Sequence, residues 1–447
     1  MRNLKIAAAV TLALGSITVA HAAGPTPTQC ASATALLYVA GSSAAQPSFA
    51  TALANDLFDT NGETVISAPA VTGSANGNFR AYCGFAKAGN GASIATGAVT
   101  LVHYRAEGGS VVGALPLASK KNIKFLDLSQ ASCQVTNPSV VGLSVNVGTT
   151  DGWTGCVTTH AVELGVTDVE PGQFATPNYP SAYSTTVFGS ATTAQLAALP
   201  STALFQQVFG LFVNTSGING GATGQAIDLS RESAANILLG NYVNWSSVPT
   251  SAGGAVSSTS QAITLVNREA GSGTRTGASV YFLGTNCGGL VPGAIVDPTP
   301  ANDGYATGDV LATAATTPGA ITYASIDNNG KQANLTMASL SGVLPSNLAA
   351  TSGAYDWWYE ATAQTATTIA SPGGSAIATW LTSGELSALA TAPHAKDILV
   401  IPNLNGGNAP GVPVTAAATS SVVGGVTIYV NPFTRSGSSC SVPVEQN

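Results

Sequence analysis

Short apolar runs alternate with amphipathic stretches along this chain. The apolar run at residues 35–40 ends at a Gly-Ser-Ser turn (41–43), and the Ala-rich stretch 44–58 that follows spaces its large apolar residues as a helix does. The same order returns further along, where the apolar run 263–266 leads into the polar turn 267–274 and then into a helical pattern. Such alternation predicts α/β layers with mainly parallel sheets.

Two parts of the chain depart from this alternation. Residues 120–160 are rich in Ser, Thr, Asn and Gly and carry two cysteines, which indicates an insertion. Residues 410–430 indicate irregular chain that ends in a strand at 426–430. Between these parts, a helix is predicted over 231–239, because Ser230 is a favourable N-cap and the apolar pattern stops at a glycine.

The first residues of the chain predict an export signal. Arg2 and Lys5 precede an apolar run at 6–14, and Ala20-His21-Ala22 has the small-x-small pattern of a cleavage site. We expect cleavage after Ala22, which leaves 447 − 22 = 425 residues. The apolar run is too short to span a bilayer, and no later run reaches about 18 apolar residues. The segment also has no cysteine for a lipobox, so the sequence predicts a periplasmic or secreted protein without a membrane span.

The composition excludes two classes of protein. Hydrophobic residues make up 45 % of the chain, which is enough for packed cores and excludes a globally disordered protein. Charged residues make up only 8 %, and 14 Lys and Arg face 21 Asp and Glu, for a net charge of -7. A chain with so few basic residues has no stripe that could neutralise a nucleic-acid backbone.

An exported protein with six cysteines is expected to form disulfides. Many pairings are possible, and the sequence does not choose among them. Proximity along the chain favours Cys133–Cys156, which leaves Cys30–Cys83 and Cys287–Cys440 by default. A structural metal site is not expected, because no two cysteines have the close spacing that such sites use.

Two turns between a strand and a helix are rich in glycine, serine and threonine. The turns are Gly41-Ser42-Ser43 and Gly271-Ser272-Gly273-Thr274, and the second is flanked by Arg268 and Arg275. A helix N-terminus carries unpaired N–H groups and partial positive charge, and glycine lets this backbone approach an anion. Arginine adds a planar fork of donors that suits phosphate or carboxylate. The two turns therefore predict an oxyanion site, the alternative being that Arg268 is a structural ion-pair residue.

Five motifs occur in the order found in one family of exported proteins. They are AGSSAAQPSF (40–49), GVTDVEP (165–171), the stretch from IDLS to NYVNW (227–245), REAGSGTR (268–275) and TPGAITY (317–323). Together they resemble the periplasmic phosphate-binding proteins of Pst-type ABC importers. The resemblance implies the type 2 periplasmic-binding-protein fold, an α/β protein of two lobes with a hinge between them, each lobe a mainly parallel sheet flanked by helices.

The resemblance also implies a division of the chain and a set of ligands. Lobe 1 would hold residues 31–175 and 320–447, with a disulfide-bearing insertion around 111–163, and lobe 2 would hold residues 176–319. Phosphate would lie between the lobes. By position in the motifs, the residues expected to bind it are Ser43, Ala44, Ser110, Asp168, Arg268, Ser272, Gly273 and Thr274. Asp168 would accept a hydrogen bond from protonated phosphate, which sulfate cannot offer.

The chain departs from the family pattern near the expected site. Ser110 is out of register in the second loop, and Glu107 adds a negative charge beside it. Ala270 stands where the family often has a carboxylate that orients the arginine. The gap before Asp168 is longer than in the family, so this residue has an alternative role in a turn or as a helix cap.

The function that these motifs imply is an exported phosphate-binding protein. It would deliver phosphate to the membrane subunits of an ABC importer, without a cofactor or a metal. The alternative is an extracellular or surface structural protein that keeps this fold without tight phosphate binding. An enzyme is not expected, because the chain has no G-x-S-x-G elbow, its turn at 271–274 lacks a Walker lysine, and the histidines after the signal have no zinc-like spacing.

Overall fold

The computed structural model describes most of the chain. The described residues are 24–59, 61–68, 79–141, 152–220, 224–288, 293–297, 303–304, 306–382, 399–400, 420–423 and 426–445. The predicted signal peptide (1–22) and part of the predicted insertion (142–151) lie outside them.

The chain alternates between strands and helices. The longer helices are α2 (Gln46–Ala52), α3 (Val111–Ser119), α4 (Ala182–Phe188), α5 (Thr193–Ala197), α6 (Arg231–Leu238), α7 (Gly273–Leu283), α8 (Thr307–Thr316), α9 (Asn347–Thr351) and α10 (Gly374–Trp380). The strands of the main sheet are β1 (Ala35–Gly41), β2 (Thr64–Ser67), β3 (Phe79–Phe85), β4 (Val99–Arg105), β9 (Leu164–Thr167), β10 (Thr202–Asn214), β12 (Thr264–Leu265), β15 (Ala320–Ser325), β16 (Leu335–Met337), β18 (Trp358–Thr365), β19 (Leu399–Val400), β20 (Ser420–Val423) and β21 (Val426–Val430). Shorter elements are α1 (Pro27–Cys30), β5 (Ile123–Leu126), β6 (Val140–Val141), β7 (Thr154–Gly155), β8 (Val157–His160), β11 (Asp228–Leu229), β13 (Asn267–Arg268), β14 (Asp303–Gly304), β17 (Ser339–Leu340), β22 (Phe433–Thr434) and β23 (Val444–Glu445).

The strand β1 lies inside one half of the sheet. It pairs in parallel with β4 and β9, while β3, β2 and β18 extend this half through antiparallel pairs. Successive side chains of a strand point to opposite faces. Leu37 and Val39 accordingly pack in the core with α2 and α10, whereas Tyr38 and Ala40 pack in the core with α3. Helices therefore cover both faces of β1.

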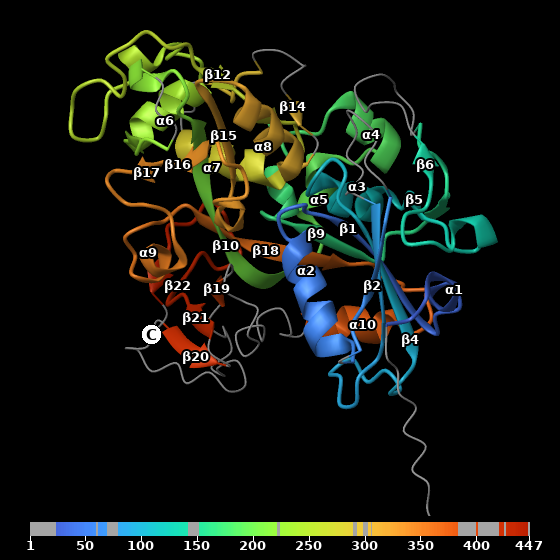
Figure 1. The fold of residues 1–447 in the computed structure, drawn as a ribbon. Helices are drawn as coiled ribbons and strands as arrows, with labels where there is room; N and C mark the ends of the chain where they lie inside the picture. The colour runs from blue at the N-terminus through green and yellow to red at the C-terminus, as the bar shows by residue number, and fades with distance from the viewer. Residues whose placement is uncertain are drawn as a thin grey trace, which may run out of the picture.

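The strand β10 joins this half of the sheet to the other half. Its first residues pair with β18, and its last residues pair with β15 and β16, while β15 pairs in parallel with β12. Phe212 packs in the core with α8, and its neighbours Leu211 and Val213 pack in the core with α6 and α7. Figure 1 shows β10 as the long green strand between the group of α6, α7 and α8 and the group of β1, β4 and α3. The predicted α/β class is confirmed.

The predicted lobe boundaries stay a prediction. The strand β15 starts at residue 320, where the return to lobe 1 was expected, yet it pairs with β10 and β12. The helices α4 and α5, expected in lobe 2, pack on α3. Residues 111–119 of the predicted insertion form α3, which packs on β1 and β9, and the added hairpins β5–β8 and β6–β7 follow it.

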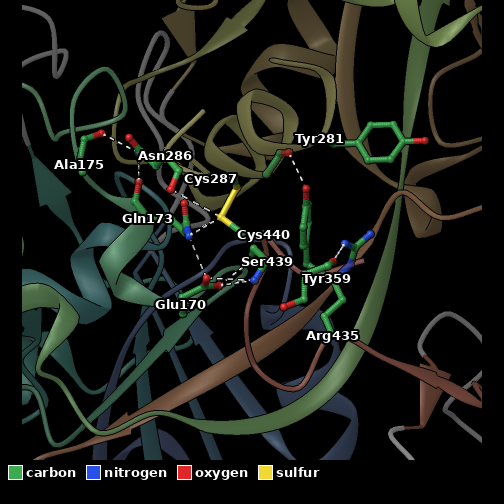
Figure 2. Close-up of a disulfide and its surroundings, with 12 residues drawn as sticks. Glu170, Gln173, Ala175, Tyr281, Asn286, Cys287, Tyr359, Arg435, Ser439 and Cys440 are labelled. Carbon is green, nitrogen blue, oxygen red and sulfur yellow. Dashed lines mark hydrogen bonds between the residues drawn. A yellow bond between two sulfur atoms is a disulfide. The ribbon is translucent and has the colours of Figure 1, made fainter. Parts of the chain in front are cut away.

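The six cysteines form the pairs that the sequence favoured. Cys30–Cys83, Cys133–Cys156 and Cys287–Cys440 have Cα–Cα distances of 6.0, 5.5 and 5.2 Å. The last pair joins the chain just after α7 to the segment at residues 433–441, here named the C-terminal segment. Figure 2 shows this disulfide beside Glu170, to which Ser439 of the C-terminal segment donates from its backbone N at 2.9 Å.

Candidate functional site

The carboxylate of Asp168 brings together four segments of the chain. Asp168 directly follows β9 and is only 3 % exposed. The hydroxyl of Ser42, in the turn after β1, donates to its Oδ1, and Thr274 Oγ1, at the start of α7, donates to its Oδ2 at 3.1 Å. The backbone N of Asp168 donates in turn to Ser110 Oγ, directly before α3, at 3.1 Å. Polar groups that lie 58, 106 and 126 residues from Asp168 along the chain thus meet at one buried carboxylate.

The contact between these loops is close enough to require glycine at its centre. A Cβ atom added at Gly273 would lie 2.2 Å from Ser110 Oγ and 2.9 Å from Asp168 Oδ2. At Gly109, whose φ of 71° is in the left-handed region, an added Cβ would lie 2.9 Å from Arg268 Nη2. The two glycines therefore leave room for these side chains, and Val111 N donates to Gly271 O at 3.0 Å where the turns before α3 and α7 meet.

Arg268 provides the cationic side of this cluster. It ends the short strand β13 and is 1 % exposed. Its Nε donates to Gly304 O at 3.3 Å, and its Nη1 donates to Thr307 Oγ1 at 3.1 Å. Thr307 Oγ1 also lies 3.2 Å from Ser43 Oγ, in the turn after β1. A second series of polar contacts, beside the one around Asp168, therefore runs from Ser43 through Thr307 to Arg268.

Each of the two buried charges in the cluster counteracts the pKa shift that burial causes in the other. Burial raises the pKa of Asp168, and the Ser42 hydroxyl and the Arg268 guanidinium act in the opposite direction. Burial lowers the pKa of Arg268, and the charge of Asp168 opposes that shift. Arginine stays protonated in proteins, so this cluster contains a fixed positive charge next to a carboxylate that holds a proton more readily than usual.

Helices begin on several sides of this cluster. Ser110 immediately precedes α3, Ser272 is the N-cap of α7, and Thr307 is the first residue of α8. The first turn of a helix carries partial positive charge, although the first N–H groups of α3 are bonded to Gly271 O, Gly109 O and Ser110 O. Together with Arg268, these helix starts place positive and partial positive charge around the cluster.

The residues that the sequence predicted as ligands meet in this cluster. The contacts above bring together Ser43, Ser110, Asp168, Arg268, Gly273 and Thr274, and Ala44 is a buried neighbour of Ser43. Ser272 has another contact, because its Oγ accepts from the backbone N of Arg275 and caps α7. Their role as ligands stays a prediction.

Two charged residues that flank the predicted turns, Glu107 and Arg275, form ion pairs with other side chains. Glu107 Oε2 lies 2.6 Å from Arg105 Nη2, and both side chains are fully buried, so its charge is balanced by this ion pair. Arg275 Nη1 lies 2.8 Å from Asp297 Oδ1 and 2.8 Å from Arg268 O. Arg275 therefore holds the backbone of the Arg268 loop.

Sequence reasoning missed two members of the cluster. Ser42 stands in a turn that the sequence singled out, and only the spatial position of Asp168 distinguishes its role from that of Ser43. Thr307 gave no such signal, because no Gly-Ser turn precedes it. A threonine at the start of an apolar helical pattern was the only local indication.

Comparison with known proteins supports the resemblance at the level of the superfamily. Residues 205–379 match the model of a family described as a PBP superfamily domain. This match agrees with the predicted resemblance to periplasmic binding proteins at the level of the superfamily. No curated protein matches the chain.

Solved structures of low identity resemble the chain. One, described as a phosphate ABC transporter substrate-binding protein with bound phosphate from Clostridium perfringens, is 12 % identical, with a TM-score of 0.45 over 81 % of this chain and 98 % of that one. The phosphate binding protein from Stenotrophomonas maltophilia is 14 % identical, with a TM-score of 0.41 over 89 % and 87 %. PstS from Borrelia burgdorferi is 12 % identical, with a TM-score of 0.34 over 83 % and 100 %.

The described residues contain neither a helix that could span a membrane nor a cluster of metal-binding side chains. No helix among them is long and apolar enough to cross a membrane. No group of three or more His, Cys, Asp or Glu side chains in these same ranges is placed to hold a metal ion.

Proposed function

We propose that this protein is an exported solute-binding protein for inorganic phosphate. The observation that carries the proposal is the buried pair of Arg268 and Asp168, surrounded by serine and threonine hydroxyls at the starts of helices. Guanidinium, hydroxyl and backbone N–H groups are donors, and a tetrahedral oxyanion accepts from several directions at once.

The carboxylate indicates which oxyanion is bound. An ionised Asp168 accepts hydrogen bonds and repels an anion that has no proton to give. Phosphate at neutral pH carries at least one proton and can donate it to Asp168, whereas sulfate carries none. A buried polar group left without a partner costs about 1–3 kcal/mol, which disfavours sulfate in such a site.

The proposed role is delivery rather than chemistry. We expect export through the predicted signal peptide, with the membrane subunits of an ABC importer as partners. Binding needs no cofactor, because the cluster itself offers the donors and the acceptor. The match of residues 205–379 to a PBP superfamily domain supports this role.

Titration calorimetry of the mature protein with phosphate tests the proposal. The wild type should bind phosphate, and Arg268→Ala should weaken binding about tenfold to a hundredfold, because a hydrogen bond to a charged group contributes on the order of 1.5–3 kcal/mol. Arg231→Ala is the matched control, because Arg231 is an exposed arginine at the start of α6 and makes its contacts with Tyr281.

Two results would contradict the proposal. If the wild type binds neither phosphate nor sulfate, the protein does not bind these anions and the structural alternative gains support. If Arg268→Ala binds phosphate as the wild type does, phosphate is bound elsewhere on the protein.

A further inference from the structure

Thr307 has the contacts of a binding residue, although neither the motifs nor the family resemblance pointed to it. It is the first residue of α8 and is 6 % exposed. Its Oγ1 accepts from Arg268 Nη1 at 3.1 Å, and the same atom lies 3.2 Å from Ser43 Oγ. It therefore touches two of the residues expected to bind phosphate.

The hydrogen bonds around Thr307 allow its hydroxyl proton to be donated to a ligand. A hydroxyl has one proton and can accept two hydrogen bonds. Arg268 can only donate, so Thr307 Oγ1 accepts from it. Thr307 N donates to Ser43 Oγ at 3.4 Å, and either hydroxyl can donate in the contact between Ser43 Oγ and Thr307 Oγ1. When Ser43 donates, Thr307 Oγ1 accepts two hydrogen bonds and its own proton can go to a bound oxyanion.

The position of Thr307 on α8 adds to this donor. The helix has ten residues, and its first turn carries partial positive charge. Asp309 Oδ2 accepts from the backbone N of Ala306 at 2.9 Å, so the carboxylate of the first turn is directed to the helix end. The charge of Asp309 also favours the protonated form of Arg268.

We infer that Thr307 is a further ligand of the bound oxyanion and that it donates its hydroxyl proton to an oxygen held by Arg268. This inference rests on the proposed function. It adds a donor from α8, in a part of the chain where the sequence showed no anion-binding motif. It also connects the Ser43 turn to Arg268, so that donors from both sides of the cluster act on one anion.

Three variants of Thr307 separate the hydroxyl from the shape of the side chain. Thr307→Val keeps the shape and removes the hydroxyl, Thr307→Ala also removes it with less bulk, and Thr307→Ser keeps it. With phosphate as the titrant, we expect Thr307→Val and Thr307→Ala to bind about tenfold more weakly than the wild type, and Thr307→Ser to stay within about threefold. Thr316→Val, at the exposed far end of α8, is the control and should bind as the wild type does.

The outcomes distinguish this inference from the proposed function. If the wild type binds phosphate and Arg268→Ala does not, but both hydroxyl-free variants bind as the wild type does, Thr307 is not a ligand and the proposed function stands. Equal losses in Thr307→Ser and Thr307→Val would also overturn the inference, because the hydroxyl would then not matter. If Thr307→Val fails to fold in a thermal scan, the comparison of Thr307→Ala with Thr307→Ser decides. Absence of phosphate binding in the wild type removes the proposed function itself.

Discussion

At the scale of single residues, the proposed function assigns the choice between phosphate and sulfate to the carboxylate of Asp168. Replacement by Asn keeps the size of the side chain and exchanges an acceptor for an N–H donor. We expect Asp168→Asn to bind phosphate modestly less tightly and to gain affinity for sulfate relative to phosphate, because the repulsion of an unprotonated oxyanion is gone. Calorimetry with both anions measures this ratio.

The Asp168→Asn variant also tests how phosphate binding depends on pH. Burial raises the pKa of Asp168, so the carboxylate takes up a proton at a higher pH than an exposed aspartate would. As the pH falls through that raised pKa, Asp168 stops being an acceptor, and phosphate binding by the wild type should weaken. We expect Asp168→Asn to lose this weakening at acid pH. Asp327→Asn is the control and should keep it, because Asp327 pairs with Lys331.

An unchanged ratio of sulfate to phosphate affinity in Asp168→Asn would contradict the role of Asp168 as proton acceptor.

Residue-level reasoning singled out most of the residues that meet in the cluster, because these residues stand in short motifs. A Gly-Ser turn before a helix and an arginine at the end of a strand are local features with a clear physical meaning. Burial and pairing are not local. The sequence identified Glu107 as an unfavourable charge, and only the fold reveals that Arg105 neutralises it. Thr307 was missed for the same reason, since its contacts with Ser43 and Arg268 depend on how distant loops meet.

At the scale of elements, the sequence predicted the strands and helices with the clearest periodicity. The expected strand at 35–40 is β1, and the expected helix over 231–239 is α6, whose N-cap Ser230 accepts from Ser233 N at 3.0 Å. The predicted helix 44–58 begins as α2 and continues at 53–57 as a π-helical turn. The course of β10 across the sheet was not predictable, because its apolar residues do not reveal which partner strand each half meets.

A buried hydrogen bond of Trp153 is one of the contacts that join the added hairpins to the site region. Trp153 Nε1 donates to Glu107 Oε1 at 3.0 Å, and Tyr183 OH donates to the same oxygen at 2.8 Å. Trp153→Phe should lower the free energy of unfolding by about 1–3 kcal/mol, because a buried carboxylate loses a donor. Chemical denaturation measures this value. Thr154→Val, which removes an exposed hydrogen bond in the same hairpin, should change it by less than about 0.5 kcal/mol.

An equal effect of the two variants would mean that the Trp153–Glu107 contact has no special share in stability. A loss of phosphate affinity in Trp153→Phe that exceeds its loss of stability would show instead that Glu107 positions the turn at Gly109 and Ser110. The two readouts therefore separate support of the fold from support of the site.

At the scale of the whole molecule, the C-terminal segment connects β18, the loop that follows Asp168 and the chain that follows α7. On β18, Glu360 Oε1 accepts from Thr434 Oγ1 at 2.7 Å and from Arg435 N at 3.0 Å, and its Oε2 accepts from Gly437 N at 2.7 Å. Arg435 Nε donates to Trp358 O at 3.0 Å. These contacts fix one end of the segment to the strand that pairs with β10 and β9.

The other end of the segment reaches the two loops that meet at the anion cluster. Ser439 binds Glu170, two residues after Asp168, and Cys440 is bonded to Cys287, just after α7. Asn286 Nδ2 donates to Gln173 O at 3.2 Å beside the disulfide, as Figure 2 shows. Since α7 begins with Gly273 and Thr274, the segment holds both the helix that carries these donors and the loop that carries Asp168.

Removal of the Cys287–Cys440 disulfide should therefore affect stability and binding together. The bond closes a loop across a sequence separation of 153, and a variant with both cysteines changed to serine should lose about 2–4 kcal/mol of unfolding free energy. Phosphate affinity should fall as well, because α7 is held less firmly against the Asp168 loop. The matched control is the same double change at Cys133 and Cys156, whose disulfide lies in the added hairpins. It should lower stability and leave affinity within about threefold of the wild type, measured by chemical denaturation and by calorimetry with phosphate. If the Cys287–Cys440 variant keeps full affinity while losing stability, the C-terminal segment supports the fold alone and is not needed to hold the site.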